Sequence, residues 1–359
     1  MEITKNDTNV LKGLAIILML LLHLFCRKDI EGFYEVFFKI NDVPFIYYIS
    51  LLGDACRPIY LFLTGYAFYI ISNKGNLIFK KNIKRIFKLM INFWIVFILF
   101  IPLAFIMKKR DIFLNIDIGE LILSLLGLSN SYNGAWWFIQ IYIIIVLLSP
   151  FIIRLVRKFN PLILIFISGV LYFISYLQRY REIIDFGDNE IILKIVAVLF
   201  LFGTSQLSFL VGAIFAKEKI YSKIHQKFFN IKHKNIFCIM GICIIIGFHS
   251  IVESSIIAPI NGVLLVFLFT IMNKSTVVEN TLSFLSKHST NIWLTHMFFY
   301  MMIFPELTFA PKYPIFIFIW LFVLSIASSY LINLIYNPIV KLLDKKGEIR
   351  LLKDNKVAG

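Results

Sequence analysis

Residues 11–25 read LKGLAIILMLLLHLF, an apolar run that contains one lysine, Lys12, and one histidine, His23. Ionisable side chains are costly inside a membrane helix, and those that occur there usually face the protein interior. Eleven residues at about 100° each turn through roughly 1100°, so Lys12 and His23 share one helix face and lie about 16 Å apart along it. This spacing predicts a cation near one membrane surface, in line with an imidazole about half a bilayer deeper. Such a pair could hold an anionic substrate while the imidazole handles a proton or an acyl group.

Each of the two residues also has a structural interpretation. A buried histidine often packs between helices and bonds to a neighbouring carbonyl, and a lysine near a helix end can extend its ammonium group to the membrane surface. Their placement on one face favours a functional role for both.

The composition excludes an ordinary soluble domain. Hydrophobic residues make up 59% of the chain, phenylalanine alone occurs 38 times, and the mean hydropathy is +0.83, which is typical of a polytopic membrane protein. We therefore expect an all-α membrane protein of about ten spans, at residues 10–26, 45–72, 86–107, 136–153, 161–177, 191–216, 236–252, 256–273, 289–304 and 314–336.

The net charge of +15 follows the membrane and does not indicate nucleic acid as a partner. Of the lysines and arginines, 25 fall in segments expected on one side and 9 on the other, so the positive-inside rule places both termini in the cytoplasm. The connections between spans are too short to fold as a separate enzyme. We expect one membrane domain over residues 1–340, followed by a short basic cytoplasmic tail at 341–359.

The second expected span contains Asp54, Arg57 and Pro58, followed by Thr64 and Gly65. Asp54 and Arg57 are three residues apart on a helix, so they could pair and offset each other's burial. Pro58 interrupts helix hydrogen bonding, and broken helices face protein or a cavity, not lipid.

A basic run at residues 80–88 leads into the third span. Such a basic run ordinarily marks the cytoplasmic side of a membrane helix. A cluster of cations without an acid could also bind the phosphates of a nucleotide-containing donor such as an acyl-coenzyme A.

Aromatic and polar residues open the fourth expected span. Paired tryptophans such as Trp136 and Trp137 usually anchor a helix at the interface, but flat rings also bind sugar faces, and Gln140 could hydrogen-bond hydroxyl groups. A second histidine, His296, lies inside the ninth expected span and could be a packing residue or a polar partner in a cavity.

Several signatures are missing from the sequence. It has no Walker A run, no G-x-G-x-x-G, no G-x-S-x-G and no His/Cys cluster with metal-ligand spacing. We therefore expect neither a metal site nor a bound cofactor.

Taken in order, the motifs resemble those of the integral-membrane acyltransferase family 3, bacterial proteins of about ten spans that modify surface polysaccharides and related envelope molecules. Lys12 and His23 resemble the family's basic-x10-His signature, and residues 61–66, LFLTGY, resemble its Phe-Phe-x-Leu-Ser-Gly-Tyr segment. Residues 136–140 resemble its Trp-Phe segment, and residues 289–296 its Ser-x-x-x-aromatic-x-x-His pattern.

The loop after the second span resembles the family's Arg-x-x-Arg element. Lys81 and Lys84 occupy one register and Asn82 and Arg85 the other, so neither register carries two arginines. Lys12 likewise stands where the family usually has arginine. Lysine lacks the planar fork of arginine, which makes bidentate phosphate recognition weaker here.

The resemblance implies a multi-pass O-acyltransferase of the bacterial cytoplasmic membrane. It would move an acyl group, expected to be acetyl, from cytoplasmic acyl-coenzyme A as co-substrate to a hydroxyl of a cell-surface polysaccharide or other envelope glycan, free or lipid-linked. In this interpretation His23 is a general base or a transient acyl carrier. His296 is the second catalytic candidate, the donor site is Lys12, Lys81, Lys84 and Arg85, the orienting or lining residues are Asp54, Arg57 and Thr64, and the acceptor side is Trp136, Trp137 and Gln140.

Two other classes remain open. A secondary transporter or exporter of a glycan or small solute could use the same buried charges as a proton relay, and it need not bind or consume acyl-coenzyme A. A non-catalytic scaffold would leave the in-phase Lys12 and His23 without a role.

Overall fold

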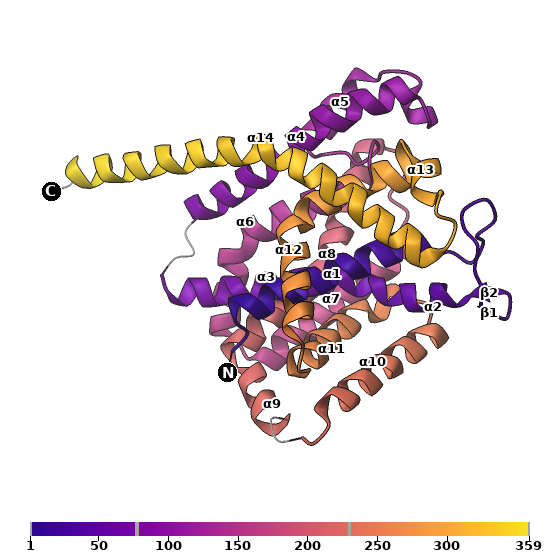
Figure 1. Cartoon of the computed structure of the whole chain (residues 1–359). Helices are drawn as coiled ribbons and strands as arrows, with labels where there is room; N and C mark the ends of the chain where they lie inside the picture. The colour runs from indigo at the N-terminus through magenta and orange to yellow at the C-terminus, as the bar shows by residue number, and fades with distance from the viewer. Residues whose placement is uncertain (1, 76–78, 229–230, 358–359) are drawn as a thin grey trace.

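The computed structural model describes residues 2–75, 79–228 and 231–357 (Figure 1). Within these ranges the two strands are β1 (Lys39–Ile40) and β2 (Val43–Pro44), which pair antiparallel with Lys39 opposite Pro44. The rest of the regular structure is helical: α1 (Lys5–Phe25), α2 (Phe45–Leu51), η1 (Leu52–Ala55), α3 (Cys56–Asn73), α4 (Phe79–Met107), η2 (Asp111–Phe113), α5 (Ile118–Leu125), η3 (Gly134–Trp136), α6 (Trp137–Lys158), α7 (Pro161–Arg181), α8 (Glu190–Lys217), α9 (Ile220–Phe228), α10 (Lys234–Ile251), η4 (Ser255–Ile257), α11 (Ala258–Ile271), α12 (Thr276–Met297), η5 (Phe298–Met302), α13 (Pro305–Phe309) and α14 (Pro314–Val357).

Seven helices in the described ranges are long and apolar enough to cross a membrane: α1, α4, α6 with η3, α7, α8, α10 and the part of α14 up to Lys345. The other three expected spans coincide with α2–η1–α3, α11, and α12 with η5, but α11 is short, and α3 and α12 carry more polar side chains. The helices support a multi-pass membrane protein, while the number of ten spans and the cytoplasmic termini stay predictions.

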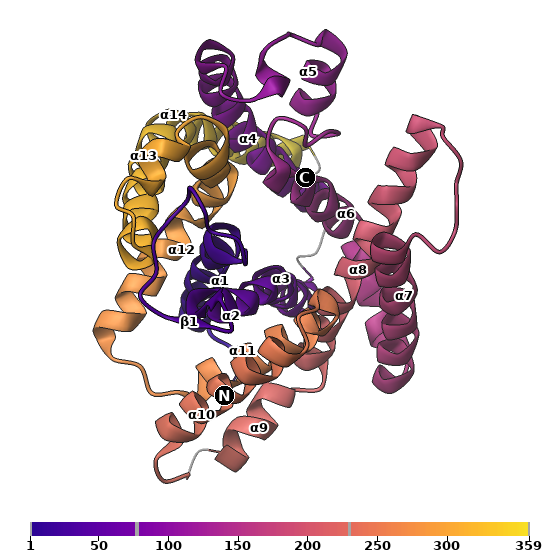
Figure 2. The ribbon, with the colours of Figure 1, turned by 90° about the vertical axis from the view of Figure 1, so that its right-hand side faces the viewer.

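Helices α1 and α3 lie at the centre of the molecule. Figure 2 shows them enclosed by α12 and α14 on one side, α4 and α6 on another, and α8 and α11 around the remainder. Contacts join α1 to α12 and α3, and join α3 to α8 and α11. A helix that is surrounded by protein need not be apolar on every face, which explains why α3 and α12 can carry polar residues.

The start of α1 is set by a capping box. The Thr4 hydroxyl accepts a hydrogen bond from the Asp7 amide, and the Asp7 carboxylate accepts one from the Thr4 amide. Further along the helix, Gly13 lies against the backbone of α12, where a Cβ would collide with the carbonyl of Leu282. A glycine at this point lets the backbones of α1 and α12 approach closely.

The basic tail expected at residues 341–359 is not separate from the last helix. Residues up to Val357 continue α14, which runs without interruption through Pro338 and projects from the helical body (Figure 1).

Candidate active site

Two histidines from distant parts of the sequence meet near the C-terminal ends of their helices. His23 lies in the last turn of α1 and His296 in the last turn of α12, and His23 Nδ1 is 2.6 Å from His296 Nε2. The two rings are nearly parallel, with 7° between their planes. His296 is fully buried and His23 is partly exposed, so His23 is the member of the pair that a substrate can reach.

The surroundings of His296 fix the direction of the hydrogen bond between the rings. His296 Nδ1 lies 2.8 Å from the carbonyl oxygen of Trp293 and 3.1 Å from that of Ile292. Carbonyl oxygens only accept, so Nδ1 carries the proton, and in the neutral ring Nε2 is then an acceptor. His23 Nδ1 must therefore donate to His296, which leaves the lone pair of a neutral His23 on Nε2.

The helix that carries His296 changes its geometry directly after it. Residues Phe298–Met302 form a π-helical turn, in which the Ile303 amide donates to the Phe298 carbonyl at 2.8 Å. π-Helical turns are rare in proteins overall, and those that occur are often found at functional sites. Tyr300 in this turn is buried, with its ring centroid 6.3 Å from that of His23 and 5.9 Å from that of His296.

Lys12 and His23 lie on the same continuous helix, as expected from their spacing. The side chain of Lys12 is partly exposed, and its ammonium group has no ion pair or hydrogen bond to the residues that the structure describes. The backbone at this point is held by Tyr60 of α3, whose hydroxyl donates to the Lys12 carbonyl at 3.2 Å. A half-buried cation without a protein partner is suited to an anionic ligand.

The other three donor-site candidates lie on the first turns of α4. Lys84 forms a 2.7 Å ion pair with Asp344 of α14, and Arg85 donates to Asn82 at 2.7 Å while its guanidinium lies over the ring of Phe68. Lys81 is exposed. The Lys84 pair is itself exposed and of a kind worth about 0–1 kcal/mol, so an incoming phosphate could displace it.

The expected ion pair between Asp54 and Arg57 is wrong. Asp54 lies in the 3-10 turn η1 and Arg57 in the first turn of α3, and among the described residues no ion pair within 4.0 Å joins the two side chains. Asp54 Oδ2 instead lies 3.3 Å from Nε2 of His249, and His249 Nδ1 is 3.2 Å from Asn261 Nδ2. In the described part of the chain neither Asp54 oxygen makes a hydrogen bond, so Asp54 faces His249 at ion-pair distance and does not contact His23.

Thr64 serves the backbone of α3. Its hydroxyl donates to the Tyr60 carbonyl at 2.7 Å, and the neighbouring Gly65 lies against the backbone of Phe209 in α8. Both contacts are structural, although Thr64 remains partly exposed.

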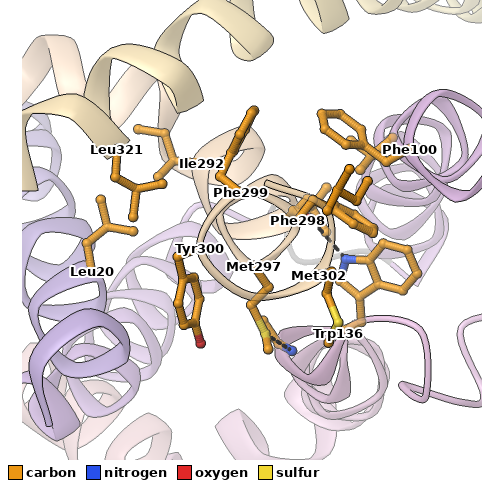
Figure 3. Packing of buried hydrophobic residues seen from close by; sticks show 14 of the residues in the cluster. Leu20, Phe100, Trp136, Ile292, Met297, Phe298, Phe299, Tyr300, Met302 and Leu321 are labelled. Atoms are coloured by element: carbon orange, nitrogen blue, oxygen red, sulfur yellow. Dashed lines mark hydrogen bonds between the residues drawn. The ribbon is translucent and has the colours of Figure 1, made fainter. Parts of the chain in front are cut away.

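The three acceptor-side candidates differ in exposure. Trp136 is only 1% exposed, and its indole nitrogen donates to the Leu294 carbonyl at 3.1 Å. Figure 3 shows its ring packed beside Phe298 and Met302. Trp137 and Gln140 are partly exposed. Trp136 therefore helps to position α12, and the acceptor hypothesis depends on Trp137 and Gln140.

The sequence pattern did not indicate Tyr300, the contact of His249 with Asp54, or Arg179, whose guanidinium lies 5.7 Å from the ring centroid of Trp137. Tyr300 follows His296 by one helical turn, a spacing that could have signalled it. The other two contacts join residues far apart in the sequence and leave no local pattern.

The family model described as an acyltransferase domain matches residues 6–334, nearly the whole chain, and this range includes both histidines. No curated protein and no solved structure matches the chain. The match does not support the transporter alternative. From its sequence and its apolar helices, this chain belongs to the integral-membrane acyltransferase family 3.

Proposed function

We propose that this membrane acyltransferase moves an acyl group, acetyl in the simplest case, from cytoplasmic acyl-coenzyme A to a hydroxyl of an envelope glycan. The observation that carries the proposal is the histidine pair, because its hydrogen-bond direction places an available lone pair on Nε2 of the more exposed ring. A basic nitrogen that is oriented by a second group is what general-base or nucleophilic catalysis requires.

In direct transfer, Nε2 of His23 takes the proton of the acceptor hydroxyl while the oxygen attacks the thioester carbonyl. The new C–O bond forms, the C–S bond breaks, and the thiolate of coenzyme A leaves and takes the proton from Nε2. In the covalent alternative, Nε2 attacks the thioester carbonyl, a C–N bond forms, the C–S bond breaks and the thiolate of coenzyme A leaves. The acceptor oxygen then attacks the acyl group, a C–O bond forms, the C–N bond breaks, and the hydroxyl proton passes to the thiolate. His296 plays the same part in both routes, since it accepts from Nδ1 and keeps Nε2 free.

The donor would bind by its phosphates at the other end of α1. Lys12 lies about 16 Å from His23 along the helix, a distance that an extended pantetheine arm can span. Lys81, Lys84 and Arg85 at the start of α4 would extend the cationic surface for the phosphates. On this proposal the thioester reaches His23 without movement of the helices.

The acceptor would approach from the other face of the membrane. The positive-inside distribution of charge supports a cytoplasmic donor side, which places the C-terminal ends of α1 and α12 toward the outer surface. Trp137 and Gln140 at the beginning of α6 are exposed enough to contact a sugar. The setting is a bacterial cytoplasmic membrane, with a free or lipid-linked glycan as acceptor.

The test is release of coenzyme A by the purified protein in lipid nanodiscs that are supplied with acetyl-coenzyme A and a crude surface-glycan fraction. We expect His23→Ala to abolish release and Lys12→Ala to raise mainly the KM for the donor. His233→Asn is the matched control, because His233 is exposed and adopts a positive φ of 62° that asparagine tolerates. Full activity of His23→Ala, or a wild-type protein that is folded yet neither binds nor consumes any acyl-coenzyme A, would refute the proposal.

A further inference from the structure

Two arginines lie against a single tryptophan at the start of α6. The Cζ atom of Arg57 is 5.6 Å from the ring centroid of Trp137, and that of Arg179, on α7, is 5.7 Å from the same centroid. Arg179 also lies 5.3 Å from the ring centroid of Tyr180. Both distances to Trp137 are within the range of cation–π attraction. Residues far apart in the sequence thus place two positive charges near one aromatic ring.

Neither arginine forms a direct ion pair with the described residues, and the Asp54 carboxylate interacts with Arg57 only at longer range. No carboxylate in the described ranges lies within 4.0 Å of either guanidinium, and no hydrogen bond to either is found there. Arg179 is exposed and Arg57 is partly exposed. Two like charges so placed repel each other, and guanidinium groups held over an aromatic ring keep their N–H groups available for an oxyanion.

The end of α7 that carries Arg179 is fixed to the loop before α11. The Tyr172 hydroxyl lies 3.2 Å from the Ser255 carbonyl and 2.9 Å from the Ile256 carbonyl, and the Tyr176 hydroxyl is 2.8 Å from the hydroxyl of Ser254. These bonds hold the helix end in place, so the backbone that carries Arg179 is positioned by the fold before any ligand arrives. A preorganised site loses less entropy when it binds.

The cluster is connected to the histidine pair through packed aromatic rings. The ring centroids of Trp137 and Phe138 are 5.6 Å apart, and those of Phe138 and Trp293 are 5.5 Å apart. The carbonyl of Trp293 accepts the hydrogen bond from His296 Nδ1. The two arginines are therefore linked to the segment of α12 that orients the catalytic pair through three packed rings, those of Trp137, Phe138 and Trp293.

We propose that Arg57, Arg179 and Trp137 form a subsite that recognises an oxyanion on the acceptor, with the indole ring against an adjoining sugar face. The inference rests on the proposed function, because it assigns the acceptor a chemical class: a glycan that carries a carboxylate, as in an acidic sugar, or a phosphate, as in a lipid-linked precursor. The guanidinium groups would hold this anion and so present a neighbouring hydroxyl to His23. Neutral glycans would bind more weakly.

The test is calorimetric titration of the full chain in phosphatidylcholine nanodiscs with three probes: glucuronate, inorganic diphosphate and uncharged glucose. We expect at least one anionic probe to bind and glucose not to bind. Removal of one charge-assisted contact by Arg57→Gln or Arg179→Gln should weaken binding about tenfold or more. Binding of glucuronate alone identifies a carboxylate, binding of diphosphate alone identifies a phosphate, and binding of both identifies their shared oxyanion chemistry.

Arg181→Gln is the matched control, since Arg181 is an exposed arginine on the last turn of the same helix. It should bind the probes like wild type, and Arg179→Lys should recover only part of the affinity because lysine keeps the charge without the planar fork. The subsite is refuted if no anionic probe binds, if the Arg57 and Arg179 variants bind as well as wild type, or if Arg181→Gln weakens binding equally. Because these titrations contain no acyl-coenzyme A, they can fail while coenzyme A release succeeds, and the reverse.

Discussion

The hydrogen bond between the two histidines predicts that His296 acts on the rate through the tautomer of His23. His296→Leu removes the acceptor that lies 2.6 Å from His23 Nδ1, at a position that is fully buried. An N–H group left without a partner in a buried site costs about 1–3 kcal/mol. His23 can avoid this cost by moving its proton to Nε2, which removes the lone pair that the reaction needs.

The same free energy sets the size of the effect. A cost of about 1–3 kcal/mol corresponds to a loss of about 5- to 160-fold in the population of the competent tautomer. We expect kcat for coenzyme A release to fall by this factor while the KM for the donor changes little. Steady-state kinetics in nanodiscs, with a parallel measurement of Tm, separates this loss from unfolding.

A glutamine at position 296 distinguishes orientation from simple packing. The side-chain carbonyl of His296→Gln can still accept from His23 Nδ1, so this variant should recover much of the kcat that His296→Leu loses. The reasoning would be refuted if the leucine variant, folded and with wild-type Tm, kept full activity. It would also fail if glutamine and leucine lowered kcat equally, because that result would show a role in packing alone.

Three further predictions follow from contacts at other positions. Gly13→Val should lower the Tm and abolish activity, because its Cβ would meet the backbone of α12 at a cost of about 1–3 kcal/mol or more. Gly247→Ala is the control: no atom lies within 4 Å of the added Cβ, so the Tm and the activity should stay unchanged. Asp344→Asn releases the lysines of α4 that it pairs, so the KM for acyl-coenzyme A should fall at low salt; a higher KM would contradict their role in donor binding. The hydrogen bond from Lys28 lowers the pKa of Glu253 below its usual 4.5. This pair therefore stabilises the fold above pH 4.5 and loses its effect as the pH falls through the lowered pKa. The Tm difference between wild type and Glu253→Gln should be present at pH 7 and vanish in acid.

The sequence predicted the structure best where the evidence was the spacing of residues within one helix. The 3.6-residue repeat placed Lys12 and His23 on one face of a helix, and the structure contains that helix without a break from Lys5 to Phe25. The apolar runs likewise predicted the positions of the membrane helices, although three of the ten expected spans coincide with helices that do not qualify by length or composition alone. Those three include α3 and α12, whose polar residues are accommodated by the helices around them.

Contacts between distant segments could not be predicted in this way. The spacing of Asp54 and Arg57 suggested an ion pair, but Asp54 lies 3.3 Å from His249, and the guanidinium of Arg57 lies near the ring of Trp137, as does that of Arg179. The approach of His296 to His23 is of the same kind, because it depends on how closely α1 and α12 can pack. Gly13 makes that approach possible, yet glycine is common in membrane helices and does not by itself indicate which helix will pack against it.

The proposed chemistry assigns the two ends of α1 different tasks. On this proposal Lys12 near the beginning of the helix would hold the donor's phosphates, while His23 in the last turn is hydrogen-bonded to His296, which directs its lone pair. Because the two side chains share one face, an extended donor lying along α1 brings its thioester about 16 Å from its charged head group. An acyl group could thus cross about half of the hydrocarbon core by the reach of the donor alone. This mechanism requires that α1 stay fixed relative to its neighbours, and the close packing of α1 against α12 and α3 meets that requirement.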